Sequence, residues 1–99
     1  LVNSKGLDAN LYPNPASKGD GIRVVIHSSW NGEAEVQIRD AIGRLVNNEF
    51  LILHPMISQG QPFEWSMGTY SPGTYTCQIR VKTTNGEILN RTLPFVIKN

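Results

Sequence analysis

The stretch GTYTCQIRVK, from Gly73 to Lys82, decides the fold class. Its apolar residues alternate with polar ones, which is the period of a strand buried on one face: Tyr75, Cys77, Ile79 and Val81. Asn85-Gly86 then gives a hairpin turn signal. We expect a second strand from Glu87 to Lys98, which either lies at a sheet edge or interrupts its pairing at Pro94, because proline cannot donate to a ladder.

Further strands are predicted ahead of this hairpin, 8–12 residues apart and without a helix. They cover Gly21 to His27, Glu33 to Asp40, Arg44 to Leu53 with a bulge near Asn47-Asn48, and Pro62 to Ser66. An extended edge segment is expected at Leu11 to Pro15. One polar and one apolar face per strand indicates an all-β, antiparallel sandwich of about seven strands. Residues 1–10 are interpreted as a linker, and residues 11–99 as one domain.

Composition agrees with an all-β domain and excludes several functions. Ninety-nine residues suffice for one core, and Val and Ile total sixteen against four Ala. The formal net charge of +1 gives no reason to expect nucleic acid as a partner. No apolar run is long enough for a membrane helix, and no signal peptide is found, so we expect any export signal upstream of Leu1.

The search for catalytic and metal-binding residues predicts no enzyme, no metal and no cofactor. Cys77 falls on an apolar strand face, where cysteine is usually a core residue. His27 and His54 are interpreted as surface residues, and no Cys/His cluster suggests zinc. Asp20 lies in a polar turn without the carboxylate series of a calcium loop.

A binding module is the alternative. Trp30 lies in a turn region and could stack on a sugar or protect a sheet edge. The run Pro72-Gly73-Thr74-Tyr75 is similar to a fibronectin type III motif, but one residue is missing. A fibronectin III-like or carbohydrate-binding accessory module of a secreted protein therefore stays open.

Four segments in order carry a resemblance to a known family. They are Leu11-Tyr12-Pro13-Asn14-Pro15, the run from Val36 through Asp40-Ala41-Ile42-Gly43-Arg44 to Val46, the run Tyr70 to Tyr75, and the final Lys98-Asn99. This order resembles the type A C-terminal sorting domain of proteins exported by the type IX (Por) secretion system of Bacteroidetes. The resemblance implies an immunoglobulin-like sandwich of about seven strands.

The same resemblance implies that the domain is a C-terminal secretion signal, which directs an upstream cargo through the outer membrane. The cargo would pass through the periplasm and reach the cell surface or the medium. The expected partners are the outer-membrane translocon and a sortase-like protease, which usually removes the domain before the cargo is attached to the surface. Self-association through edge strands is a further expectation.

Site residues follow from the motifs. The motif and recognition candidates are Pro13, Asn14, Pro15, Asp40, Gly43, Gly73, Tyr75 and Lys98. Most of these can be explained by folding alone, for example by turn chemistry at Asp40 and Gly43 or by a tyrosine-corner bond at Tyr75. Lys98 is the best candidate for direct recognition. Cleavage is expected within the linker, at Asn3, Ser4, Lys5, Gly6, Leu7, Asp8, Ala9 or Asn10.

Overall fold

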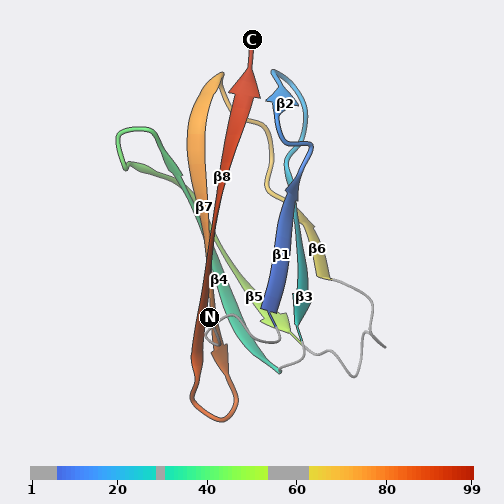
Figure 1. The fold of residues 1–99 in the computed structure, drawn as a ribbon, viewed down its shortest axis with the longest axis vertical. Coiled ribbons are helices and arrows are strands. Elements are labelled where there is room, and N and C mark those ends of the chain that lie inside the picture. Colours follow the sequence, from blue (N-terminus) through green and yellow to red (C-terminus); the bar gives the residue numbers. More distant parts are fainter. Residues whose placement is uncertain (1–6, 29–30, 54–62) are drawn as a thin grey trace.

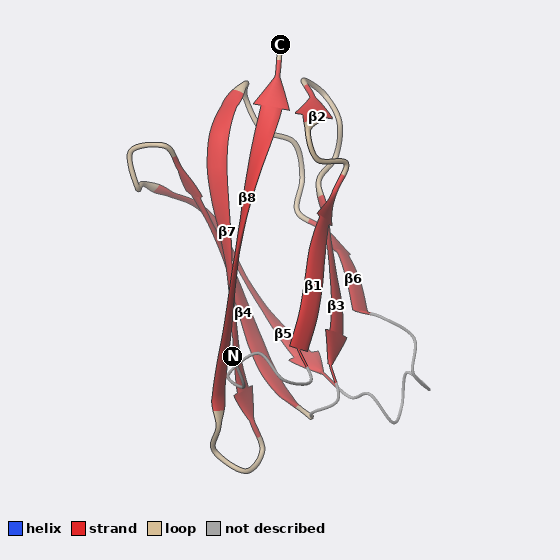
Figure 2. Cartoon of the chain, viewed as in Figure 1, coloured by secondary structure: helices blue, strands red, loops and turns tan. Residues whose placement is uncertain are grey.

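The computed structural model describes residues 7–28, 31–53 and 63–99, and there it contains strands and connecting loops (Figure 2). Eight strands are present in these ranges: β1 (Leu7–Tyr12), β2 (Ala16–Ser17), β3 (Arg23–Ser28), β4 (Gly32–Asp40), β5 (Leu45–Leu53), β6 (Phe63–Ser66), β7 (Gly73–Thr83) and β8 (Ile88–Lys98).

The strands form two sheets that face each other (Figure 1). One sheet has the order β1-β3-β6 and the other the order β2-β8-β7-β4-β5. Every pair is antiparallel except β2 with β8, which is parallel. The predicted all-β sandwich is confirmed.

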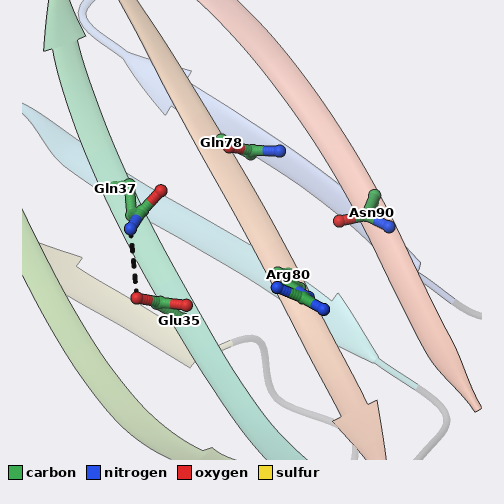
Figure 3. Close-up of a pocket in the computed structure, with 5 residues that line it drawn as sticks. All are labelled: Glu35, Gln37, Gln78, Arg80 and Asn90. Carbon is green, nitrogen blue, oxygen red and sulfur yellow. Dashed lines mark hydrogen bonds between the residues drawn. The ribbon is translucent and has the colours of Figure 1, made fainter.

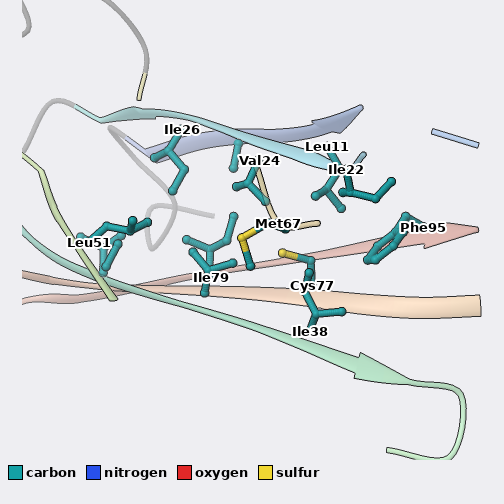
Figure 4. Close-up of a cluster of buried hydrophobic side chains, with 14 of the residues drawn as sticks. Leu11, Ile22, Val24, Ile26, Ile38, Leu51, Met67, Cys77, Ile79 and Phe95 are labelled. Carbon is teal, nitrogen blue, oxygen red and sulfur yellow. The ribbon is translucent and has the colours of Figure 1, made fainter. Parts of the chain in front are cut away.

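The core lies between the sheets and follows the alternation of the sequence. Cys77, Ile79 and Val81 of β7 are buried, as the pattern of GTYTCQIRVK predicts. Figure 4 shows side chains from both sheets pointing into the shared layer, among them Val24 and Ile26 of β3. Burial of this single apolar layer is the main stabilising contribution in a domain without a disulfide.

The first strand differs from the prediction. β1 begins at Leu7, so Leu7 to Asn10 are paired with Val25 to Ser28 and do not belong to a linker. Ala9 is fully buried and Leu11 is buried beside it, with Asn10 exposed between them. This alternation is too short, among Asp and Asn residues, to stand out in the sequence. Residues 1–6 of the expected linker lie outside the described part.

Two details of strand pairing were partly predicted. β8 is an edge strand along most of its length, because β2 pairs with it only at Ile97 and Lys98. The Pro94 carbonyl points to this open edge, where Asn14 Nδ2 donates to it over 3.2 Å. The missing N–H of Pro94 therefore costs no ladder bond. The bulge in β5 lies at Val46, one residue before the expected Asn47.

Candidate recognition surface

The Tyr-Pro-Asn-Pro motif carries the chain from one sheet to the other. Tyr12 ends β1 in the three-stranded sheet, and Ala16 begins β2 in the five-stranded sheet. The prolines at 13 and 15 stand between the two strands, where no ladder N–H is required. The Tyr12 hydroxyl donates to Glu64, and Asn14 is anchored on the carbonyl of Pro94. The motif thus has a structural role at this crossing.

The residues after the motif hold the end of β8. Ala16 is opposite Ile97 and Ser17 is opposite Lys98. The Lys18 N–H donates to the Lys98 carbonyl over 2.7 Å, and Ile97 is only 3% exposed. The backbone of Lys98 is therefore part of the fold, whereas its side chain is exposed. This separation makes Lys98 suited to a contact with a partner.

Asp40 organises the turn between β4 and β5. Its Oδ1 accepts the N–H groups of Arg44, at 2.9 Å, and of Ile42, at 3.2 Å, and its Oδ2 accepts Arg44 Nε at 2.9 Å. Burial raises the pKa of Asp40, but the hydrogen bonds and charge of Arg44 outweigh it and lower the pKa below its usual value. Gly43 completes the turn at φ 86°, a conformation that favours glycine.

Tyr75 fastens the loop before β7. Its hydroxyl donates to the Ser71 carbonyl over 2.6 Å, which is the kind of bond made in a tyrosine corner. Its ring stacks on Phe95 with centroids 5.2 Å apart. Gly73, which lies between Ser71 and Tyr75 in the chain, has a φ of 152°. Both residues therefore shape the loop from within.

Tyr70, the first residue of the third motif segment, has a structural role that the sequence did not indicate. Its hydroxyl donates to the Met67 carbonyl over 2.6 Å and accepts Asn47 Nδ2 at 3.0 Å. Burial raises the pKa of this phenol. Neither Tyr70 nor Asn47 belongs to an alternating run, and their meeting depends on β5 lying beside the loop before β7.

The motif segments converge at one end of the sandwich. A hollow of about 340 Å³ is lined by four residues of the β4–β5 turn, Asp40, Ala41, Ile42 and Arg44, and by Ser71 to Tyr75. Gly73 is opposite Ile97, and Ile97 is opposite Ala16, so the N-terminal motif and the end of β8 join the same end. Figure 1 shows β2, the end of β8, the start of β7 and the β4–β5 hairpin far from the β7–β8 hairpin. We call this region the motif end.

A second hollow, of about 320 Å³, lies on the outer face of the five-stranded sheet. Figure 3 shows its polar lining on β4, β7 and β8: Glu35, Gln37, Gln78, Arg80 and Asn90. Gln37 Nε2 donates to Glu35 Oε2 over 3.1 Å. Phe50, which is 71% exposed, is opposite Glu35 in the register.

Comparison with known proteins decides the family. Residues 10–91 match the family described as the secretion system C-terminal sorting domain. The chain belongs to this family. The match extends over most of the chain and includes three of the four motif segments.

Comparison with solved structures supports the fold of the sorting domain. The crystal structure of CopC from Methylosinus trichosporium OB3b superimposes with a TM-score of 0.62 at 17% identity, and the alignment covers 93% of this chain and 91% of that chain. At this identity the likeness concerns the fold alone. No curated protein matches the sequence.

The sorting domain offers little chemistry in its described residues. The family is one of sorting signals, not of enzymes. Burial raises the pKa of Cys77 to about 12, so its thiol stays protonated at neutral pH and is a poor nucleophile. In residues 7–28, 31–53 and 63–99 no three His, Cys, Asp or Glu side chains gather to hold a metal ion. The same ranges contain no helix that is long and apolar enough to cross a membrane.

Several sequence predictions concern residues outside the described part. Trp30, His54 and the cleavage candidates Asn3 to Gly6 lie there. His27 lies in β3 and is exposed, in agreement with a surface role. The cleavage candidates Leu7 to Asn10 are within β1.

Proposed function

We propose that this sorting domain directs an upstream cargo across the outer membrane by the type IX secretion system, with the translocon as its partner. Membership of the sorting-domain family carries the proposal. It makes the chain a signal of an exported protein, destined for the cell surface or the extracellular space. The route through the periplasm and recognition by the translocon are parts of the proposal.

The geometry of the motif end supports this function. Sequence segments more than twenty residues apart are brought to one end of the sandwich. A receptor that reads this end contacts the folded domain, whatever cargo precedes it. A folded sorting signal of this kind suits a secretion system that exports unrelated cargo proteins.

Removal of the domain by a sortase-like protease, followed by surface attachment of the cargo, completes the proposal. A protease needs an extended, accessible backbone in its cleft. Leu7 to Asn10 pair with β3, so cleavage there would require β1 to detach. We therefore place the cut among Asn3, Ser4, Lys5 and Gly6, ahead of the first strand.

The test is delivery of a reporter. A reporter with an export signal is fused ahead of the chain and expressed in a type IX-competent host, and surface reporter is measured by protease accessibility on intact cells. We expect delivery with the unaltered domain and a severalfold loss with Lys98→Glu. Lys82→Glu is the control, because Lys82 is an exposed lysine beside the β7–β8 hairpin, at the other end of the sheet.

Substitution at Lys98 is a sharper test than truncation. Removal of Ile97 would take away a buried side chain and the pairing with β2, so a truncation would confuse unfolding with lost recognition. A folded reporter fusion that accumulates in the periplasm with the unaltered domain would contradict the proposal.

Carbohydrate binding is the second candidate, favoured by the polar hollow of Figure 3. Amide, carboxylate and guanidinium groups there offer paired donors and acceptors for sugar hydroxyls, and the ring of Phe50 is next to them. A glycan array tests it. Specific binding that is lost in Gln78→Ala and Phe50→Ala, and kept in Val96→Ala at the other end of β8, would support a sugar site; an array without signal would exclude it.

A further inference from the structure

Residues of the motif end fall into two groups. One group is used by the fold: Asn14 binds the Pro94 carbonyl, Asp40 closes its turn, and Tyr75 binds the Ser71 carbonyl. The other group consists of exposed residues whose apolar side chains lie outside the buried core. Ile42 is 81% exposed and Val96 is 40% exposed, and Pro72 is exposed between Ser71 and Gly73.

The turn at Ile42 does not need an apolar residue. The β7–β8 hairpin makes the same turn from Thr83 to Glu87, with matching backbone bonds and with Gly86 in the place of Gly43. Asn85 stands there in the position of Ile42. Since the backbone is equally satisfied by Asn, an exposed isoleucine at position 42 has no role in closing the turn.

The exposed apolar residues form a continuous surface. Ile42, Pro72 and Thr74 line the same hollow. Thr74 is directly opposite Val96, and cross-strand neighbours of this kind lie about 5 Å apart at Cβ. Val96 is exposed between the buried residues Phe95 and Ile97, which places it and its cross-strand partner Thr74 on the outer face of the five-stranded sheet. We call Ile42, Pro72, Thr74 and Val96 the apolar strip.

Positive charges flank the apolar strip. The Arg44 side chain is 72% exposed at one side, and the Lys98 side chain follows Val96 on the same face of β8 at the other. Arg44 Nε forms an ion pair with Asp40 Oδ2 at 2.9 Å, so the positive charge in excess at the motif end is that of Lys98. At the opposite end of this sheet face the charges are matched, because Glu33 is opposite Lys82 and Glu35 is opposite Arg80. A partner surface with acidic groups at its rim therefore complements the motif end and not the other end.

We infer that the apolar strip, with Arg44 and Lys98 beside it, is the docking surface for an apolar, acid-rimmed patch of the translocon. The motif residues Asn14, Asp40, Gly43, Gly73 and Tyr75 act by shaping this surface and do not contact the partner themselves. The inference rests on the proposed sorting function and identifies the surface of the domain that the translocon would contact.

Matched substitutions in the reporter fusion test the inference. Val96→Glu is compared with Ile88→Glu, because the two residues are 40% and 41% exposed on the same face of β8 at opposite ends. Ile42→Glu is compared with Phe50→Glu, whose side chain is 71% exposed. We expect Val96→Glu and Ile42→Glu to reduce surface delivery at least tenfold, while Ile88→Glu and Phe50→Glu change it less than twofold.

Thermal unfolding of the four variants separates docking from folding. Ile42→Glu should leave the melting temperature unchanged, because this turn residue contributes nothing to the core. Equal delivery by the motif-end variants and their controls would overturn the docking surface and leave the sorting function standing. Failure of the unaltered fusion to reach the surface would overturn the sorting function, and the docking surface with it.

Discussion

The two long hairpins of the five-stranded sheet make the same turn at opposite ends of the molecule. In each, the first residue of the turn pairs its N–H with the carbonyl of the fifth over 2.9 Å, and a side-chain oxygen of the first residue accepts the N–H of the fifth. Gly43 and Gly86 have φ values of 86° and 92°. The difference lies in what is presented: Ile42 and Arg44 in one hairpin, Asn85 and Glu87 in the other. The hydrogen bonds of the first and fifth residues and the glycine at the fourth position thus determine the backbone of the turn. The exposed side chains at the third and fifth positions can differ without changing it.

The largest effect on the free energy of unfolding is expected from Phe95, which packs below the β4–β5 hairpin. Phe95 is buried, stacks on Tyr75, and Tyr75 is opposite Asp40. Phe95→Ala should cost about 3–5 kcal/mol in the free energy of unfolding, a large share of the about 5–15 kcal/mol typical of a domain. Leu89→Ala, near the second hairpin, should cost about 2–5 kcal/mol and is the comparison. Urea unfolding measures both, and a smaller loss for Phe95→Ala would contradict the stronger support.

The cap of the second hairpin should give the next effect. Thr83 is buried, and its Oγ1 accepts the Glu87 N–H at 3.0 Å and donates to Asn85. Thr83→Val keeps the shape and removes these bonds, at a cost of about 1–3 kcal/mol. Thr84→Val, an exposed neighbour in the same turn, should change the unfolding midpoint little. Equal midpoints for the two variants would show that the hydroxyl cap contributes nothing.

Glycine substitutions test whether the turns are equivalent. An added Cβ meets no atom within 4 Å at Gly43 or Gly86, so the cost is conformational and amounts to about 1–2 kcal/mol at each position. Gly43→Ala and Gly86→Ala should therefore lower the melting temperature equally. Gly21→Ala is the control, with open space and no left-handed backbone. Clearly unequal losses at 43 and 86 would reject the equivalence.

The smallest effect is a difference in acid sensitivity. The folded-state pKa of Asp40 lies below its unfolded value, about 3.9 for Asp. Its ionised form therefore stabilises the domain above about pH 4, and this contribution is lost as the pH falls through the lowered pKa. Thr83 does not titrate. Asp40→Asn should flatten the stability profile below about pH 4, measured by thermal unfolding, while Thr83→Val should leave its slope unchanged.

How far the sequence alone leads differs between β7 and β2. In β7 the alternation from Tyr75 to Val81 extends over several residues, and both its strand and its buried face were predicted. In β2 only two residues pair, and their partner is about eighty residues further along the chain. A pairing of that kind leaves no periodic pattern, so it could not be predicted. The early start of β1 at Leu7 was missed for a similar reason.

The motif residues also divide into those that local sequence identifies and those whose role depends on the tertiary structure. Asp40 and Gly43 are turn residues that local chemistry identifies, and the family resemblance based on them is confirmed. Ile42 did not stand out, because an apolar residue inside a turn has no local signature. Its exposure, and its place in one hollow with Pro72 and Thr74, depend on how β4, β5 and β7 are arranged.

By itself, the sequence determined the fold class, the single core and the family. These depend on short-range periodicity, turn residues and ordered motifs, which neighbouring residues carry. The tertiary structure alone decided that the four motif segments meet at one end, that the Lys98 backbone is held while its side chain is free, and that an apolar strip lies between Arg44 and Lys98. The physical reason is that sheet register joins residues far apart in the chain, and register is set by the packing of the whole core.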